Sequence, residues 1–221
     1  ISGLSVSITD NVFTTAQTTY YPIRFLEELQ TQTITGNTFP EVSRIYLNSA
    51  TCNTNKTLQV YQNLPYTVHD ITISNNSTLT LASNAVLNFG STTGITVQSG
   101  SSLIASGVNF KGYSSSVDII MNYGNLDLQY SIFDKGRITM GSSGKYSISN
   151  NSLGAVNLVL LSSTGTVIGN KITEGYILLK SSASIIDNVF SSTETPYYPI
   201  WFYEELQTQT ITGNTFPEVS R

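Results

Sequence analysis

The side chains that could carry acid–base or metal chemistry are few in this 221-residue sequence. There is one histidine, His69, which stands beside Asp70 in a stretch that we interpret as a turn before a strand. A single histidine excludes a His-rich metal site and leaves only one base for a Ser-His-Asp arrangement. Cys52 is the only cysteine, so no disulfide can form within the chain. We therefore interpret His69 as an ordinary surface residue.

Carboxylates are the remaining candidates for catalysis. Glycoside hydrolysis uses two of them, about 5 to 10 Å apart across a cleft. The only adjacent pairs are Glu27–Glu28 and Glu204–Glu205, which we interpret as a solvated acidic ridge. The aspartates stand singly, at Asp10, Asp70, Asp118, Asp127, Asp134 and Asp187, and no Asp-rich loop of the calcium-binding type is present. We expect no catalytic residue, no metal site, no cofactor and no enzymatic activity.

The composition narrows the class of protein further. Only 11% of the residues are charged, the net charge is −4, and 39% are hydrophobic. This mild acidity gives no basic surface for nucleic acid. The frequent β-branched and aromatic residues argue against disorder. The sequence contains no run of 18 apolar residues, so we expect no membrane span in this segment.

One long repeat governs the organisation of the chain. Residues 10–44 align with residues 187–221 at an offset of 177 positions (187 − 10 = 177), and 28 of the 35 aligned residues are identical. Residues 45–177 show no comparable second copy. We interpret residues 1–221 as one continuous β-solenoid, in which 10–44 and 187–221 are equivalent segments of successive 177-residue tandem units.

A shorter period lies inside the long one. ITDNVF, ITGNTF, ISNNSL, VIGNKI and IIDNVF each place an asparagine two residues before a large apolar residue, in steps of about 18 to 26 residues. Together with the period-two alternation between them, these steps indicate stacked β-solenoid rungs. Stacked amides can hydrogen-bond along a ladder and so avoid being buried without partners. The expected ladder is Asn11, Asn37, Asn151, Asn170, Asn188 and Asn214.

The pattern NVF…YYPIRF…ITGNTF resembles the coils of right-handed parallel β-helix repeat proteins, a group that includes large secreted and cell-surface solenoids of bacteria and archaea. The resemblance covers nearly the whole chain. It implies an all-β, right-handed parallel β-helix, which we expect to have about nine to ten rungs. Enzymes of this fold that resemble pectate lyases and polygalacturonases rely on clustered Asp, His, Lys or Arg on one face. We find no such cluster in the sequence.

Two sets of surface residues are candidates for contacts. Tyr-Tyr-Pro-Ile recurs at 20–23 and 197–200, so Tyr20, Tyr21, Tyr197, Tyr198 and Trp201 form a candidate interaction loop. The alternative interpretation is that these rings cover the flank of the coil. Asn55, Asn75, Asn76 and Asn150 each begin an Asn-x-Ser/Thr triplet and are candidate N-glycosylation sites.

We expect a structural segment of a long, tandem-repeat extracellular fibre, stalk or surface filament. Its partners would be copies of itself end to end, as covalent tandem units or stacked coils, with lateral fibre contacts or glycans beside them. With about eight rungs per unit at about 4.8 Å each, a unit would rise about 38 Å. The alternative is an adhesin that binds polysaccharide or protein through the Tyr-rich loops. A polysaccharide lyase or hydrolase is the least favoured interpretation.

Overall fold

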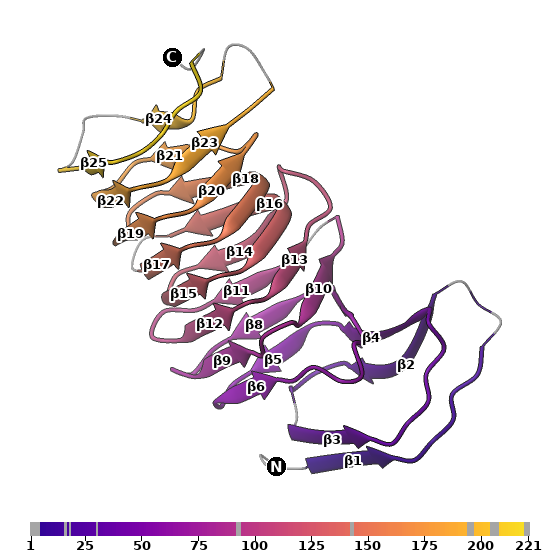
Figure 1. Ribbon diagram of the computed structural model, residues 1–221. Coiled ribbons are helices and arrows are strands. Elements are labelled where there is room, and N and C mark those ends of the chain that lie inside the picture. Colours follow the sequence, from indigo (N-terminus) through magenta and orange to yellow (C-terminus); the bar gives the residue numbers. More distant parts are fainter. Residues whose placement is uncertain are drawn as a thin grey trace.

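The chain folds into a stack of short parallel strands with about eight turns. The computed structural model describes residues 5–15, 17, 19–29, 31–91, 94–141, 144–193, 197–203 and 208–218. These residues form strands and turns but no helix, so no described segment could cross a membrane as a helix. Figure 1 shows the strands stacked as rungs along the length of the molecule. The all-β parallel β-solenoid expected from the sequence is confirmed.

One face of the solenoid is an eight-stranded parallel sheet. Neighbours in this sheet come from successive turns, because the chain travels once around the coil between them. Its members are β6 (Lys56–Leu58), β9 (Thr78–Leu81), β12 (Ser102–Ser106), β15 (Asn125–Gln129), β17 (Lys145–Ser149), β19 (Thr164–Ile168), β22 (Ala183–Ile186) and β25 (Thr210–Thr212).

The other faces belong to a fifteen-stranded parallel sheet. One path through it runs over β2 (Tyr20–Phe25), β4 (Ser43–Leu47), β7 (Tyr66–Val68), β10 (Val86–Phe89) and β13 (Asn109–Lys111). A second runs over β5 (Ala50–Cys52), β8 (Ile71–Ile73), β11 (Ile95–Val97) and β14 (Asp118–Asn122). The long strands β16 (Ile132–Met140) and β18 (Ser152–Leu160) join both paths, which end at β20 (Lys171–Thr173), β23 (Val189–Ser191), β21 (Ile177–Leu179) and β24 (Ile200–Phe202).

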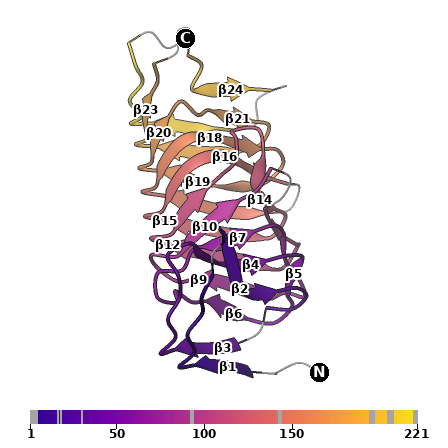
Figure 2. The ribbon, with the colours of Figure 1, turned by 90° about the vertical axis from the view of Figure 1, so that its right-hand side faces the viewer.

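Strands β1 (Ser5–Thr9) and β3 (Thr31–Thr35) do not belong to either large sheet. They pair only with each other and form a separate two-stranded sheet. Figures 1 and 2 show this pair beyond β6 at the N-terminal end of the stack. The sequence predicted nine to ten rungs, whereas the continuous stack has about eight turns. The difference arises because β1 and β3 do not join the eight-stranded sheet.

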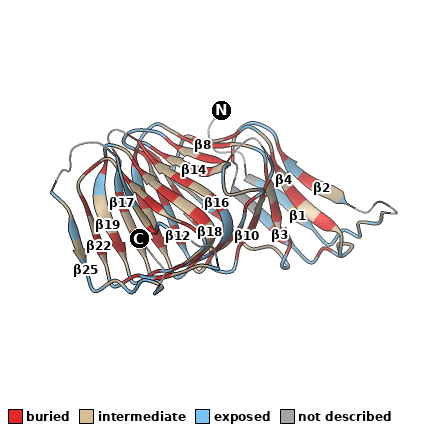
Figure 3. Ribbon diagram, turned by 90° about the horizontal axis from the view of Figure 1, so that it is seen from above, coloured by how far each residue is buried: buried red, intermediate tan, exposed pale blue. Residues whose placement is uncertain are grey.

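The core is built from ladders of identical or similar side chains. Along the strands, buried residues alternate with half-buried or exposed ones, as Figure 3 shows. Leu79, Leu103 and Leu126 lie in register on consecutive rungs and are almost completely buried. The rings of Phe110 and Phe133 stack with centroids 4.2 Å apart. Successive rungs of the continuous stack therefore cover one another along its length.

Each bend out of the eight-stranded sheet uses a residue with positive φ. Glycine, asparagine and aspartate tolerate this left-handed conformation best, which explains the Gly and Asn clusters between the strands. The residue after the bend then points inward and is buried at most rungs. From β9 to β25 the bend residues are Asn84, Gly107, Tyr130, Asn150, Gly169, Asp187 and Gly213.

Candidate functional site: an asparagine ladder and two open ends

Buried asparagines on consecutive turns are linked side chain to side chain. The Asn188 Oδ1 atom accepts hydrogen bonds from the backbone N–H and the Nδ2 of Asn170, at 2.9 and 3.0 Å. Asn170 accepts the same two bonds from Asn151, and Asn214 accepts them from Asn188. The ladder begins at Ser131, whose N–H donates to Asn151 Oδ1 at 2.8 Å.

The amide nitrogens of the ladder hold the turn backbone. Asn188 Nδ2 also donates to the carbonyl oxygens of Val167 and Ile186, at 2.9 and 3.0 Å. One buried side chain thus joins its own turn, the turn before it and the turn after it. The ladder has a direction, because each asparagine oxygen accepts from the preceding rung. At its C-terminal end, the backbone N–H of Asn214 has no acceptor among the described residues.

A second, separate ladder stands at the N-terminal end. Asn37 Oδ1 accepts from the N–H and Nδ2 of Asn11, at 2.9 and 3.1 Å, and Asn37 Nδ2 donates to the carbonyl oxygen of Ile8 at 2.7 Å. The structure therefore arranges the six asparagines in two runs, Asn11–Asn37 and Asn151 to Asn214. Between them, Ala85 and Val108 occupy the inward corner position, and neither has an amide to continue the ladder.

The two copies of the duplicated segment build the same pair of rungs. β1 pairs with β3 in the register Ile8–Ile34, and β22 pairs with β25 in the equivalent register Ile185–Ile211. The ring stack that follows each pair also recurs, as Phe13–Phe39 at 4.8 Å and Phe190–Phe216 at 5.2 Å. The local geometry therefore follows the sequence, although the copies lie at opposite ends of the stack.

The two copies differ in what covers them from the C-terminal side. Phe25 is 8% exposed, whereas its equivalent Phe202 is 50% exposed. Likewise, Ile34 is buried and Ile211 only half-buried. In the N-terminal copy the strands after residue 43 lie on this side. No described strand follows the C-terminal copy, so its apolar residues form an open end.

The opposite difference appears on the N-terminal side. Phe13 is half-buried, whereas its equivalent Phe190 is 2% exposed. Asn11 is exposed, whereas its equivalent Asn188 is fully buried. The C-terminal copy is covered here by the preceding rung. Each copy therefore shows the neighbour that the other lacks.

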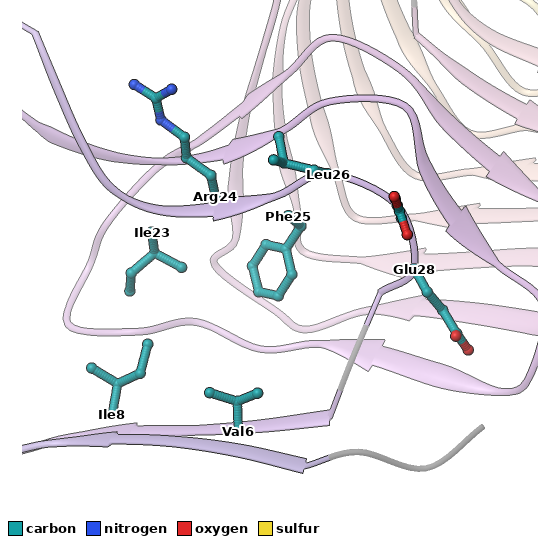
Figure 4. Close-up of a pocket in the computed structure, with 8 residues that line it drawn as sticks. Val6, Ile8, Ile23, Arg24, Phe25, Leu26 and Glu28 are labelled. Carbon is teal, nitrogen blue, oxygen red and sulfur yellow. The ribbon is translucent and has the colours of Figure 1, made fainter. Parts of the chain in front are cut away.

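The open N-terminal end contains a cavity of about 410 Å³ between β1 and β2. Figure 4 shows Val6 and Ile8 from β1 facing Ile23 and Phe25 from β2 across this space. Its walls are thus the unfinished core of the first turn. The acidic pair Glu27–Glu28 lies at its edge, and the equivalent pair Glu204–Glu205 lies outside the described residues.

The tyrosines of the candidate interaction loop separate into inward and outward positions. Tyr197 is 6% exposed, and its hydroxyl donates to the carbonyl oxygen of Gly175. Tyr198 and Trp201 are 42% and 49% exposed, with ring centroids 5.6 Å apart. A third ring, Tyr176, lies 5.9 Å from Trp201. The outer surface at the C-terminal end is therefore aromatic.

The equivalent tyrosines of the N-terminal copy are less exposed. Tyr20 and Tyr21 are both half-buried. Tyr21 packs on Tyr46 of β4, with ring centroids 5.0 Å apart, and the Arg24 guanidinium lies 5.8 Å from the Tyr21 ring centroid. The next rung thus reduces the exposure of this aromatic surface.

The side chains that could take part in acid–base or metal chemistry are not gathered into one site. His69 is exposed at the corner between β7 and β8. Asp118 forms an ion pair with Arg137 and accepts from the Thr139 hydroxyl at 2.5 Å, and the hydrogen bond to Asp118 raises the pKa of Arg137. The described residues contain no group of three His, Cys, Asp or Glu that could hold a metal ion.

Four of the other aspartates have local structural roles. Asp10 and Asp187 are bend residues with positive φ. Asp134 accepts from the backbone N–H of Gly112 at 2.7 Å, and Asp127 accepts from Gln129 Nε2 at 2.9 Å. Each of these four carboxylates therefore has a structural partner or a turn conformation that accounts for its presence.

The four asparagines of the sequons are all exposed. Asn75, Asn76 and Asn150 are in tight turns with positive φ. Asn55 accepts a hydrogen bond from the backbone N–H of Thr78 through Oδ1, at 2.8 Å. The fold therefore leaves these four residues on the surface.

Comparison with protein-family models, curated proteins and solved structures finds no match for this chain. The class of protein is therefore defined by its own architecture, a parallel β-solenoid with internal asparagine ladders.

Proposed function

We propose that this chain is a structural segment of a tandem-repeat extracellular fibre, stalk or surface filament, related to the right-handed parallel β-helix repeat proteins. The observation that carries the proposal is the duplicated segment, which folds into the same two rungs at both ends of the stack. Residues at the same position of the repeat therefore form a rung of the same geometry. A stack that continues through further units requires this property.

A mechanical role fits the energetics of this architecture. In a solenoid each rung contacts only its neighbours, so stability is close to a sum over neighbouring pairs, and added units extend the structure without altering it. Stacking also pairs most strand edges, so open edges remain only at the ends and at the break between β3 and β6. The low charge, 11% of residues, permits close packing of long stretches.

A length measurement tests this proposal. We would extend the chain by a second copy of residues 45–221, giving 398 residues (221 + 177 = 398), and compare both chains by small-angle X-ray scattering. The longer chain should lengthen by about 38 Å, the rise of about eight rungs, without becoming wider. Two separate particles joined by a flexible linker, or one compact particle, would contradict a fibre.

Adhesion is the second candidate function, favoured by the exposed rings of Tyr198 and Trp201 beside Tyr176. Exposed aromatic rings of this kind bind sugar rings and protein surfaces. A glycan array with the Tyr198→Ala and Trp201→Ala variants tests it, with Tyr130→Ala as a control at another exposed tyrosine. Signal that persists unchanged in the first two variants would end this hypothesis.

Activity on polysaccharides remains the least favoured function. A lyase or hydrolase requires clustered acidic or basic groups in a groove, and the described acidic residues are distributed over turns and separate strands. Turnover of pectin, alginate or a related polymer by the purified chain would reverse this order.

A further inference from the structure

The strand that ends the stack occurs twice at the same repeat position. Residues 23–25 of β2 are equivalent to residues 200–202 of β24 (23 + 177 = 200). β24 pairs with β21, in the preceding turn, and β2 pairs with β4, in the following turn. Among the described strands, neither has a partner on its other edge. The two copies together show this strand with both of its neighbours.

The register of the following neighbour is visible in the N-terminal copy. Ile23 pairs with Ile45, Arg24 with Tyr46, and Phe25 with Leu47. The backbone carbonyl of Phe25 also accepts from the N–H of Asn48, at 3.0 Å. This strand thus gains both backbone hydrogen bonds and core contacts from residues 45–48.

The C-terminal copy lacks these contacts and shows the consequence. Phe202 is 50% exposed, although Phe25 is 8% exposed at the same repeat position. Trp201 and Phe202 of this edge strand, and Tyr203 directly after it, are each about half exposed. An edge strand with such residues is a template for pairing with another strand.

We propose that β24 is the junction between successive units, and that it pairs in parallel with the strand of the next unit that corresponds to β4. The register is Ile200 to Ile45, Trp201 to Tyr46, and Phe202 to Leu47 of the following copy. This proposal rests on the proposed fibre and adds the segment and the register by which its units join.

The outer surface of the junction supports the same register. On β24, Trp201 already packs beside Tyr176 of the preceding turn. Tyr198, the equivalent of Tyr21, is 42% exposed beside Trp201. It would receive Tyr46 of the next unit as Tyr21 receives Tyr46 within this chain, with ring centroids 5.0 Å apart. The rings would then form an outer row that crosses from one unit to the next. Rings already stack between neighbouring rungs inside the core, at Phe110 and Phe133.

Only one sheet would cross the junction. β3 and β6 do not pair, so the eight-stranded sheet begins anew after the duplicated segment. β25 is equivalent to β3, and its outer edge would likewise stay unpaired. The isolated pair β1–β3 then corresponds to the last two strands of a preceding unit's sheet, β22 and β25.

Disulfide trapping tests the register in the 398-residue extended chain (221 + 177 = 398). Directly paired residues of parallel strands have Cα atoms within the range that a disulfide bridges, whereas a shift of two residues places them beyond it. We would combine Trp201→Cys with Tyr46→Cys in the second copy, in a background with Cys52→Ser in both copies. The matched control replaces Tyr46→Cys by Arg221→Cys. Arg221 is the repeat equivalent of Arg44 (44 + 177 = 221) and stands two residues before Tyr46 of the added copy. Within β4, Arg44 alternates with the buried residues as Tyr46 does.

A positive control comes from the structure itself. Arg24→Cys with Tyr46→Cys in the first copy joins a pair already in register, so its oxidation shows that the chain has folded. We expect a disulfide in this positive control and in Trp201→Cys with Tyr46→Cys of the added copy, and at least tenfold slower formation in Trp201→Cys with Arg221→Cys. Failure of the junction pair while the positive control forms, or equal rates with Tyr46→Cys and Arg221→Cys, would overturn the junction. A rod-shaped extended chain would in either case leave the fibre standing.

Discussion

Asn170 and Asn188 are joined by two hydrogen bonds that end on one atom. The backbone N–H and the side-chain Nδ2 of Asn170 both donate to Asn188 Oδ1, at 2.9 and 3.0 Å. Both residues are almost completely buried, so water cannot replace these bonds. The pair therefore holds two turns at one spacing, and its loss should be costly.

Asn188→Ala should lower the free energy of unfolding by about 3 kcal/mol. The substitution leaves the N–H and Nδ2 of Asn170 without their acceptor and removes the donor to Val167 and Ile186. Each buried polar group without a partner costs about 1–3 kcal/mol. Urea denaturation followed by circular dichroism measures the loss.

Two variants give this result its meaning. Asn214→Ala, at the half-buried end of the same ladder, should cost about 1 kcal/mol because water reaches the abandoned groups. Asn125→Ala, on an exposed position of β15, should change stability by less than about 0.5 kcal/mol. Equal losses in all three variants would show that burial does not set the energy of the ladder.

The ladder illustrates how much of the site can be predicted from sequence. The spacing of asparagine before a large apolar residue identifies six positions, and the structure places each of them next to another. Ser131 occupies the same corner and donates to Asn151, but a serine in YSIF is a weak signal. The sequence therefore reveals a ladder position only where that position is an asparagine.

The separation of the sheets could not be predicted in the same way. β3 ends at residue 35 and β6 begins at residue 56, a spacing that resembles other rungs. Whether the two strands pair depends on the path of β4 and β5 between them. The spacing of the rungs along the sequence contains no information on that path. The exposure of Phe202 relative to Phe25 follows from neighbours in space, so it too required the structure.

Two buried tyrosines should respond differently to loss of their hydroxyl groups. The Tyr66 hydroxyl donates to the carbonyl oxygen of Gln59, whereas the buried Tyr146 hydroxyl has no hydrogen-bond partner among the described residues. Tyr66→Phe should therefore destabilise the fold by about 1 kcal/mol, and Tyr146→Phe should be neutral or stabilising. Differential scanning calorimetry of the two single variants compares their stabilities. A Tyr146→Phe variant that is as destabilised as Tyr66→Phe would contradict the prediction.

The same two tyrosines should make the fold sensitive to alkali. Burial raises the pKa of both Tyr66 and Tyr146, so the folded state retains protons that the unfolded state loses above about pH 10. Stability is then fully present below that pH and should fall by about 1.4 kcal/mol per pH unit for each tyrosine. Denaturation between about pH 9 and pH 12 measures the slope. The variant with both Tyr66→Phe and Tyr146→Phe should lose most of this pH dependence. An unchanged slope in that variant would mean that other groups cause the loss of stability.

Cys52 provides a probe of whether the solenoid opens one rung at a time. The thiol is fully buried near the N-terminal end, and burial raises its pKa, so a disulfide reagent should react only after local opening. Phe25 of β2 pairs with Leu47 of β4, which precedes Cys52 by five residues in the next rung. Phe25→Ala therefore weakens the rung beside Cys52, whereas Phe202→Ala makes the same change at the other end of the stack. Rungs couple to their nearest neighbours. Phe25→Ala should therefore accelerate the labelling of Cys52 about tenfold or more, and Phe202→Ala less than about twofold. A tenfold change corresponds to a loss of about 1.4 kcal/mol in the free energy of local opening. Equal acceleration by the two variants would mean that the stack opens as one cooperative unit.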